Sequence, residues 1–339
     1  MRLIKTEDAV GHVLCHDMTQ IIKDQYKDAR FRKGHVVTEE DIPVLLSMGK
    51  EHLYVWEMTP GMVHENDAAE RLLALCGQEN MIRSGVKEGK IELKAACDGV
   101  FLVDSARLVA VNSQDEVMIA TRKGGMAVRE GDKLAGMRVI PLIIEEEKLR
   151  KAEQAAGDKP LLSLKPYVRK TACIVATGGE VKKGLIKDTF TPVVIDKLKT
   201  YGIETIEVVY SGDGVENVRD AVLAMREKKP DMILCTGGMS VDPDDNTPGG
   251  IKAAGANIIA YGAPVLPGAM FLLGYFDDGM PVMGLPGCVM YAGATVFDLV
   301  LPKIAADVPV TRADLAALGE GGLCLGCKPC HYPICPFGK

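Results

Sequence analysis

The spacing of apolar and polar positions changes near residue 168, where short irregular elements give way to alternating strands and helices. Residues 171–177, TACIVAT, form a continuous apolar run, which is typical of a strand buried on both faces. Apolar positions at helical spacing follow, and the alternation repeats as far as residue 305. Repeated strand–turn–helix units predict an α/β sandwich with a mostly parallel sheet.

The same pattern gives approximate bounds for each element of this region. The expected strands are 171–177, 203–210, 232–235, 257–260, 269–275 and 281–284, and the expected helices follow the N-cap residues Thr191 and Asp213 or cover 247–255 and 288–305. Ligands of open parallel sheets bind beyond the carboxyl ends of the strands. We therefore expect the functional site in the loops that follow these strands.

The first 150 residues predict two smaller units. Residues 1–60 predict an α+β unit, with strands at 3–6, 11–16 and 52–56 and a helix that Thr38 caps and Gly49 ends. Residues 61–150 predict a β-rich module, with a helix at 67–76 and extended runs at 90–96, 99–103, 107–112, 116–121 and 138–144. A linker at 151–167, the α/β domain at 168–306 and a cysteine-rich tail at 307–339 complete the predicted organisation.

Composition narrows the possible partners. The 339 residues include 40 Lys and Arg against 46 Asp and Glu, a formal net charge of −6, which disfavours nucleic acids and membranes as partners. The uncharged stretch 280–297 contains two prolines and three glycines, so it predicts a strand, a turn and a helix rather than a membrane span. No secretory signal is recognisable, and six cysteines scattered singly through apolar contexts predict reduced thiols and a cytoplasmic protein.

Three glycine-rich turns follow predicted strands. They are Thr177-Gly178-Gly179-Glu180, Thr236-Gly237-Gly238-Met239-Ser240 and Gly284-Leu285-Pro286-Gly287. Glycine lets the backbone turn sharply and present its N–H groups to an oxyanion. Any one of these turns could be only a tight connection, but three of them at the same edge of one sheet predict a phosphate site.

Acidic residues accompany the first two turns. Asp188 follows the first, and Asp242, Asp244 and Asp245 follow the second. Carboxylates beside a phosphate are compatible with a bridging Mg²⁺, because the cation cancels the repulsion between the two anions. The alternative is that these residues cap helices and solvate loops. We expect Asp188, Asp242 and Asp245 to take part in metal binding or catalysis.

The order and spacing of these pieces resemble a known family. The stretches TGGEV-x-x-G-x-I-x-D at 177–188 and TGGMSVDPDD at 236–245, together with Pro267-Gly268 and GLPG at 284–287, look like the molybdopterin-binding domain of molybdenum cofactor biosynthesis proteins over residues 168–306. AVGHVLCHDMT at 9–19 loosely resembles the opening of molybdopterin molybdenumtransferases. The resemblance implies a three-layer α/β domain that binds the pterin-phosphate cofactor, with acidic residues that help to hold Mg²⁺, molybdate or a nucleotide.

The family's functional positions can be carried over to this sequence. Thr236, Gly237, Gly238 and Ser240 would cradle the ligand, Asp188 and Asp245 would lie beside the metal or the adenylate, and Gly284–Gly287 would close the pocket. The implied ligands are molybdopterin or its adenylate, and molybdate. Members of such families often form homo-oligomers with sites between chains, and a molybdoenzyme is a further implied partner.

Two departures from the family pattern affect the expected activity. The transferases usually place a lysine and a proline after Pro-Gly, where this chain has Ala269 and Met270. They usually continue GLPG with Asn-Pro and a small hydroxyl residue, where this chain has Cys288, Val289 and Met290. Apolar groups give an oxyanion no donors. Pterin binding is therefore favoured over molybdate insertion, and a non-catalytic carrier or sensor becomes an alternative.

The second turn also resembles another class of protein. Its Pro243, Asp244, Asp245 and Thr247 are similar to the nucleotide-cleaving domain of competence/damage-inducible proteins, which act on pyridine nucleotides or ADP-ribose. A pyrophosphatase-type hydrolase is therefore a second enzymatic interpretation.

The remaining cysteines are concentrated in the tail, as Cys324-x2-Cys327-x2-Cys330-x4-Cys335-Pro336. This spacing is close to the C-x2-C-x2-C-x3-C-P run of ferredoxins, with one extra residue in the last gap. An iron–sulfur cluster or a Zn²⁺ ion with four thiolate ligands would fit it. Disulfides or an unstructured reactive tail are the alternatives, and a metal is preferred in a cytoplasmic protein.

Overall fold

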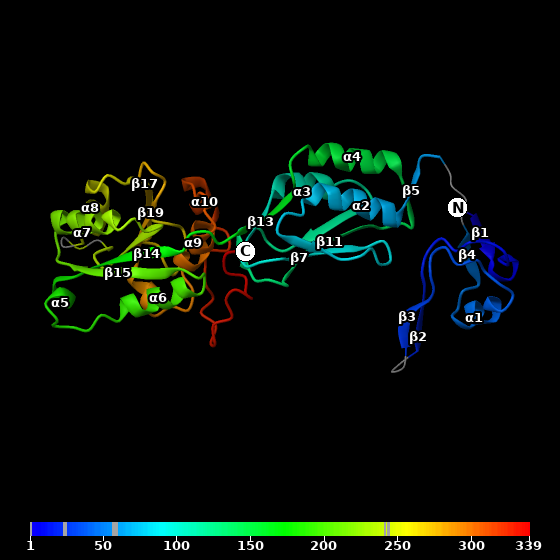
Figure 1. Cartoon of the computed structure of the whole chain (residues 1–339), viewed down its shortest axis with the longest axis horizontal. Helices are drawn as coiled ribbons and strands as arrows, with labels where there is room; N and C mark the ends of the chain where they lie inside the picture. The colour runs from blue at the N-terminus through cyan, green and yellow to red at the C-terminus, as the bar shows by residue number, and fades with distance from the viewer. Residues whose placement is uncertain (1, 23–25, 56–59, 241, 243–244) are drawn as a thin grey trace. The chain divides into compact units, whose positions relative to one another are not determined.

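The chain forms two compact units in a computed structural model that describes residues 2–22, 26–55, 60–240, 242 and 245–339. The first unit comprises Met1–Ala96, Val103–Gly124 and Gly131–Ser163, and the second comprises Cys97–Leu102, Gly125–Glu130 and Leu164–Lys339. Figure 1 shows the elements of both units along the chain. The finer boundaries expected at residues 60, 150 and 167 stay predictions.

The first unit is built from short strands and helices. In chain order they are β1 (Arg2–Lys5), η1 (Thr6–Asp8), β2 (Met18–Ile22), β3 (Tyr26–Phe31), α1 (Asp41–Ser47), β4 (His52–Val55), β5 (Met62–His64), α2 (Glu65–Cys76), β6 (Met81–Arg83), β7 (Ile91–Ala95), α3 (Ser105–Asn112), β9 (Val117–Thr121), β11 (Lys133–Val139), β12 (Ile143–Glu145) and α4 (Glu146–Ala156). The largest sheet of this unit has the order β6-β7-β11-β9 and is antiparallel throughout.

The prediction of a strand at 107–112 was wrong, because these residues belong to helix α3. Asp104 is the N-cap of this helix, and its carboxylate accepts the N–H of Arg107 at 3.1 Å. The Arg107 side chain in turn donates to the carbonyl oxygens of Lys159 and Pro160 at 2.6 and 3.0 Å. An apolar run such as LVAV fits either a strand or a helix, and here the cap and these long-range bonds decide for the helix.

Two further expectations near the N-terminus differ from the structure. Residues 11–16 form no strand, and only isolated bridges involve Val13 and Leu14. Strands β2 and β3 pair antiparallel instead, over residues that the hydrophobic pattern left unassigned. The strand expected at 52–56 is present as β4, and Trp56 lies outside the described residues.

The second unit contains the predicted alternation of strands and helices. Its elements are β8 (Gly99–Val103), β10 (Met126–Val128), β13 (Leu162–Pro166), β14 (Thr171–Thr177), α5 (Gly179–Lys182), α6 (Phe190–Lys199), β15 (Glu204–Ser211), α7 (Val215–Glu227), β16 (Met232–Thr236), α8 (Thr247–Ala253), β17 (Asn257–Tyr261), β18 (Leu272–Tyr275), β19 (Pro281–Leu285), η2 (Gly287–Met290), α9 (Val296–Ala305) and α10 (Arg312–Ala317). The main sheet has the order β15-β14-β16-β19-β18-β17.

Strands β15, β14, β16 and β19 pair parallel, whereas β18 is antiparallel to both of its neighbours. The predicted α/β fold is therefore confirmed. Helices lie on both faces of this sheet, with α7 and α8 on one side and α6 on the other (Figure 1).

Alternate residues of the central strands enter two different cores, which explains why these strands are apolar throughout. Ile174 and Leu234 pack with residues of α6 and α9 in one core. Val175 and Cys235 pack with residues of α7 and α8 in the other. All four side chains are fully buried, and complete burial raises the pKa of the Cys235 thiol to about 12, which keeps it protonated and inert.

The last predicted helix is shorter than expected. Residues 288–305 are divided between η2 and α9, with residues 291–295 between them. Thr295 is the N-cap of α9 and forms a capping box with Asp298, so the helix begins after it. The Thr-x-x-Asp spacing is a sequence signal that the prediction overlooked.

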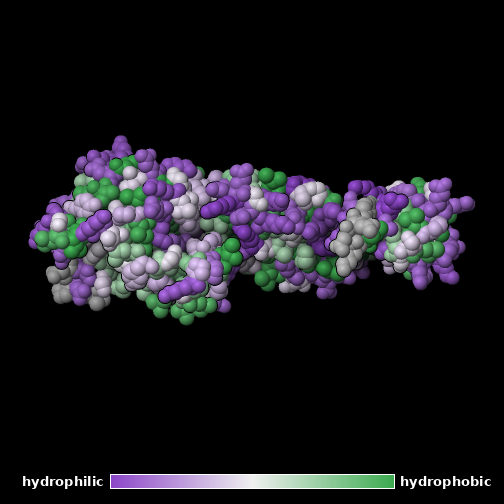
Figure 2. All heavy atoms as spheres, turned by 90° about the horizontal axis from the view of Figure 1, so that it is seen from below, coloured by the Kyte–Doolittle hydropathy of each residue, from purple (hydrophilic) through white to green (hydrophobic). Residues whose placement is uncertain are grey.

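No helix within the described ranges is long and apolar enough to cross a membrane. On the face shown in Figure 2, hydrophobic side chains lie in separate groups among hydrophilic ones.

Candidate functional site

The register of the sheet brings the ends of three parallel strands together. Ala176 of β14 is opposite Thr236 of β16, and Thr236 is opposite Leu285 of β19. The three glycine-rich turns therefore start side by side at the carboxyl edge of the sheet, as the sequence predicted. Strand β18 begins at this edge too, because Leu272 is opposite Gly284.

The first and second turns are held together by threonine hydroxyls. The Thr177 hydroxyl donates to the carbonyl oxygen of Thr236 at 2.9 Å, and the Thr247 hydroxyl donates to that of Gly237 at 2.8 Å. The two hydroxyl oxygens lie 3.0 Å apart, and all three threonines are buried. Thr177, expected to bind the ligand, thus uses its hydroxyl to join the two turns.

The close approach of these turns requires glycine at two successive positions. Gly237 and Gly238 have φ angles of 83° and 56°, in the region that favours glycine. A Cβ at residue 237 would overlap the carbonyl oxygen of Thr177, and one at residue 238 would lie 2.8 Å from the Thr247 hydroxyl. Among the hydrogen bonds of the described residues, none uses the N–H of Gly237 or Gly238. The turn therefore has two backbone donors available for an anion.

The third turn packs against the second. A Cβ at Gly284 would lie 2.5 Å from the Met239 sulfur, so these two turns are in contact. Gly268 has a φ of 129° and packs against Val296 at the start of α9. Pro267 and Gly268 belong to the connection between β17 and β18, which leaves and re-enters the sheet beside the third turn. Glu180, Ser240 and Gly287 are exposed.

Asp188 shows both a structural role and an unused oxygen. Its Oδ1 accepts the N–H groups of Phe190 and Thr191 at 2.9 and 3.0 Å, which caps the start of α6. Its Oδ2 is buried and accepts no hydrogen bond of good geometry in the described part of the chain, although the Tyr210 hydroxyl lies close enough to interact with the carboxylate. Burial and the Asp188 carboxylate together raise the pKa of Tyr210. Thr191, expected to be the N-cap, lies inside the helix.

The acidic residues after the second turn bond to one another. The Asp245 carboxylate accepts the N–H of Asp242 at 3.1 Å, and the Asp245 N–H donates to the Asp242 carbonyl oxygen at 2.9 Å. Asp244 and Pro243 lie outside the described residues. No interaction joins Asp188 to Asp242 or Asp245 among the residues that the structure describes, so their joint catalytic role stays a prediction.

Two residues that the sequence reasoning did not assign to the site stabilise its loops. Asp213, expected to cap α7, instead accepts the N–H of Gly179 at 3.0 Å, while Gly214 takes the N-cap position. The Tyr261 hydroxyl donates to the Met239 carbonyl oxygen at 2.9 Å. Burial, followed by the charge of Asp245, raises the pKa of Tyr261. Each of these bonds joins loops from different strands, so no local sequence signal indicates them.

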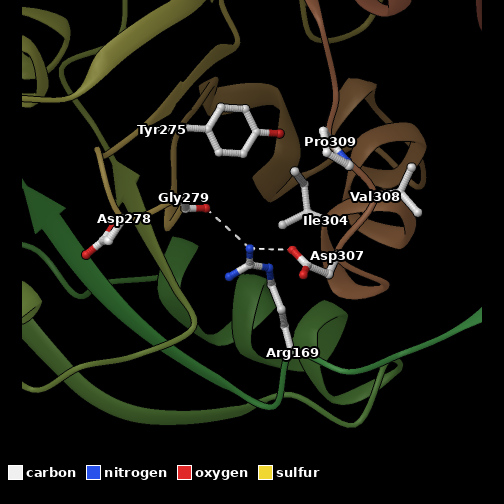
Figure 3. A pocket seen from close by; sticks show the side chains of 8 residues that line it. All are labelled: Arg169, Tyr275, Asp278, Gly279, Ile304, Asp307, Val308 and Pro309. Atoms are coloured by element: carbon white, nitrogen blue, oxygen red, sulfur yellow. Dashed lines mark hydrogen bonds and ion pairs between the residues drawn. The ribbon is translucent and has the colours of Figure 1, made fainter.

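A cavity of about 380 Å³ lies at the opposite edge of the sheet, near the amino ends of the strands (Figure 3). Arg169 donates to the carbonyl oxygens of Asp231 and Gly279 at 2.7 and 3.3 Å and pairs with Asp307 at 2.6 Å. The Asp307 carboxylate balances the charge of the guanidinium, and the three interactions connect Arg169 to three other chain segments. The residues that line the cavity therefore have a structural role. The cavity lies at the opposite end of the strands from the glycine-rich turns.

The tail cysteines do not converge on one point. Across the described ranges, no group of three or more His, Cys, Asp or Glu side chains is arranged to hold a metal ion. All ten cysteines of the chain are free thiols in the structure. The iron–sulfur or Zn²⁺ site at Cys324, Cys327, Cys330 and Cys335 stays a prediction.

The fold defines the second unit as an α/β domain with three glycine-rich turns at the carboxyl ends of its parallel strands. Comparison with known families agrees with this definition. Residues 173–306 match the family described as "Probable molybdopterin binding domain", so this part of the chain is similar to the domains of that family. Residues 3–57 match a family described only as a domain of unknown function (DUF8806).

Curated relatives share only a short stretch with the chain. A CinA-like protein of Mycobacterium tuberculosis is 33% identical over 76 residues, which is 22% of this chain and 18% of that protein. One from Mycobacterium marinum is 32% identical over the same length. The chain thus spans about a fifth of the length of the curated relatives it matches.

Solved structures of low sequence identity were also found. The molybdopterin biosynthesis enzyme MoaB from Thermus thermophilus is 16% identical, covers 42% of this chain and 98% of its own, and has a TM-score of 0.36. CinA from Thermoplasma acidophilum is 18% identical, covers 40% and 98%, and has a TM-score of 0.34. A molybdenum cofactor biosynthesis protein from Pyrococcus furiosus is 14% identical, covers 93% and 64%, and has a TM-score of 0.27.

Proposed function

We propose that the second unit binds molybdopterin or adenylylated molybdopterin during molybdenum cofactor biosynthesis, with the phosphate at the second glycine-rich turn. The observation that supports this most is the pair of unused N–H groups at Gly237 and Gly238. A phosphate oxygen needs such donors, and the absence of side chains lets it approach the backbone. We further propose that the unit is the three-layer sandwich implied by the resemblance, since α6 and α9 cover one face and α7 and α8 the other.

Asp188 would contribute through a divalent cation. Its buried Oδ2 accepts no hydrogen bond of good geometry in the described part of the chain, and the neighbouring Tyr210 hydroxyl is neutral, so the carboxylate charge has no cation beside it. Mg²⁺ bound there would neutralise the carboxylate and the ligand phosphate together. Asp245 and Asp242 would supply further oxygen ligands from the loop after the second turn.

The apolar replacements favour cofactor binding over molybdate insertion. Val289 is buried, and the Met290 sulfur accepts the Thr189 hydroxyl at 3.1 Å, so neither residue offers a donor to an oxyanion. Ala269 and Met270 likewise carry no polar side-chain group. We therefore propose that the domain binds the cofactor as a carrier or sensor. Molybdate insertion would be an additional, catalytic function of the same site.

The hydrolase interpretation keeps one specific observation in its favour. The curated relatives are CinA-like proteins, and the resemblance to the nucleotide-cleaving domain rests on the same second turn. A diphosphate could occupy the Gly237 and Gly238 donors in place of a pterin phosphate. The two functions therefore share a site and differ in the ligand.

The first test is a titration of the ligand-free full chain with molybdopterin in the presence of Mg²⁺. Asp188→Asn keeps an oxygen for the α6 cap but removes the charge, so we expect binding to weaken about 10- to 100-fold, as for a lost charge-assisted contact. Asp196→Asn, within α6, is the matched control, because the Asp196 side chain is 77% exposed and pairs only with Lys199 in the described residues.

Parallel assays separate the alternatives. Pterin binding without molybdate-dependent turnover supports the carrier role, whereas turnover supports insertion. Hydrolysis of ADP-ribose without pterin binding would replace the proposal with the hydrolase. Equal affinity in the Asp188→Asn variant and the wild type would remove Asp188 from the site.

A further inference from the structure

The four tail cysteines line a single cavity of about 230 Å³. Its remaining walls are His331, the aromatic rings of Tyr332 and Phe337, and apolar side chains that include Leu325 and Ile334. Cys324 and Cys335 are half-buried, whereas Cys327 and Cys330 are exposed. Thiols that are scattered along twelve residues of sequence are thus gathered around one space.

The segment that carries these thiols is anchored at both ends. At its start, the Cys324 N–H donates to the Leu266 carbonyl oxygen at 2.8 Å. Toward its end, the Tyr332 hydroxyl donates to the Asp298 carbonyl oxygen at 3.0 Å, and Phe337 is buried in the core that contains α6 and α9. These contacts fix the loop against the second unit, which argues against an unstructured reactive tail.

The arrangement favours a cluster over a single ion. Zn²⁺ requires four ligands that meet at one point, with Zn–S bonds of about 2.3 Å. No three metal-binding side chains converge in this way within the described residues, although all four cysteines line the same cavity. A polynuclear centre has its metal atoms spread apart, so its ligands surround a volume rather than a point. Four cysteines are also the usual ligand set of two-iron and four-iron clusters.

We propose that Cys324, Cys327, Cys330 and Cys335 bind an iron–sulfur cluster in this cavity. In the proposed step, a preassembled cluster is transferred from a small thiol or a scaffold protein that holds it through thiolate ligands. Each cysteine sulfur bonds to one iron atom, one thiolate of the donor leaves that iron, and the cysteine proton goes to the leaving thiolate, so iron and sulfide keep their oxidation states. This site does not include the glycine-rich turns, so the proposal can be correct or wrong independently of the proposed function.

A close contact allows the placement of Cys330 to be tested. A Cβ at Gly293 would lie 2.8 Å from both the Cβ and the sulfur of Cys330. Gly293→Ala should therefore displace this ligand without removing any thiol. Gly85→Ala is the matched control, because nothing lies within 4 Å of a Cβ at Gly85.

The experiment is anaerobic purification of the full chain, followed by reconstitution with ferric iron, sulfide and excess dithiothreitol and by measurement of iron, acid-labile sulfide and zinc. We expect equal amounts of iron and sulfide, with a visible charge-transfer absorption. Both should fall to background in Cys327→Ser and Cys330→Ser, and should be reduced in Gly293→Ala. Cys97→Ser, a half-exposed thiol outside the cavity, and Gly85→Ala should retain them.

The opposite results are equally clear. Zinc without sulfide would overturn the proposal in favour of a single ion, and a chain that remains metal-free after reconstitution would overturn it altogether. Iron retained in Cys330→Ser, or unchanged in Gly293→Ala, would contradict the assignment of Cys330. Because Cys327 and Cys330 are exposed, circular dichroism of their variants should match the wild type, so loss of iron cannot be attributed to unfolding.

Discussion

At the scale of single residues, the candidate site depends on positions that are occupied by glycine and therefore carry no side chain. Gly237 and Gly238 leave the backbone of the second turn uncovered and let it touch Thr177. Met239, in the same turn, fills the space beside Gly284 instead. The proposed anion site therefore depends on the contacts between the three turns, and Gly237 and Gly238 are the positions of the second turn that tolerate no side chain.

Gly237→Ala should abolish ligand binding and destabilise the fold. The added Cβ combines left-handed strain of about 1–3 kcal/mol with overlap of the Thr177 carbonyl oxygen. Gly255→Ala is the matched control, since Gly255 has a φ of +91° but open space around its Cβ position. In urea unfolding, Gly237→Ala should lose more unfolding free energy than Gly255→Ala. In titration with molybdopterin, only Gly237→Ala should lose binding. Equal losses of stability would contradict the close approach of the two turns.

The sequence could predict these glycines but not the use of the threonine hydroxyls. A Gly-Gly pair after an apolar run is a local signal, and the register of β14, β16 and β19 placed all three turns at one edge as expected. The Thr177 and Thr247 hydroxyls meet across 70 positions of sequence. Their pairing depends on side-chain packing in the folded sheet, which hydrophobic periodicity does not contain.

At the scale of elements, the sequence-based predictions of secondary structure were wrong where an apolar run is compatible with more than one type of element. Helix α3 was predicted as a strand because its LVAV run is apolar and partly β-branched. Helix α9 was extended over η2 because residues 288–305 are apolar, although the Thr295 capping box marks its start. Strands β14, β16 and β19 gave no such ambiguity, because they are buried almost throughout, whereas the outer strands β15 and β17 are partly exposed.

Hydrogen bonds of the Asp231 carboxylate join the starts of the central strands β14 and β16. The Asp231 carboxylate, which precedes β16, accepts bonds from the Lys170 N–H, the Thr171 N–H and the Thr171 hydroxyl at 2.6, 2.8 and 2.9 Å. Burial acts to raise the pKa of Asp231, but these bonds outweigh it and lower the pKa. Asp231→Asn should therefore cost about 1–3 kcal/mol of unfolding free energy at neutral pH.

The pH dependence of this effect has a definite sign. A carboxyl whose pKa is lowered on folding stabilises the fold above its unfolded pKa, and the contribution disappears as pH falls through the folded value. The difference between wild type and Asp231→Asn in urea unfolding should therefore shrink below about pH 4. Asp220→Asn, at a residue 65% exposed, should change stability by less than about 0.5 kcal/mol at any pH. A difference that grows in acid would contradict the assignment.

At the scale of the whole molecule, the two units are interleaved in sequence. Residues 97–102 and 125–130 belong to the second unit, although the chain on either side of them belongs to the first. The Tyr167 hydroxyl, for example, donates to the Gly99 carbonyl oxygen at 2.8 Å. Composition and linker signals predict boundaries along the chain, so they could not indicate segments that leave one unit and return.

The cysteine-rich tail contributes to the hydrophobic core of the second unit. Phe337 is 2% exposed and packs with the residues of α6 and α9, whereas Ile334, three residues earlier, is 86% exposed. Phe337→Ala should lower the unfolding free energy of the metal-free chain by about 3–5 kcal/mol, through lost burial and the cavity it leaves. Ile334→Ala should change it by less than about 0.5 kcal/mol. Matching urea midpoints for the two variants would show that the tail is not part of the folded core.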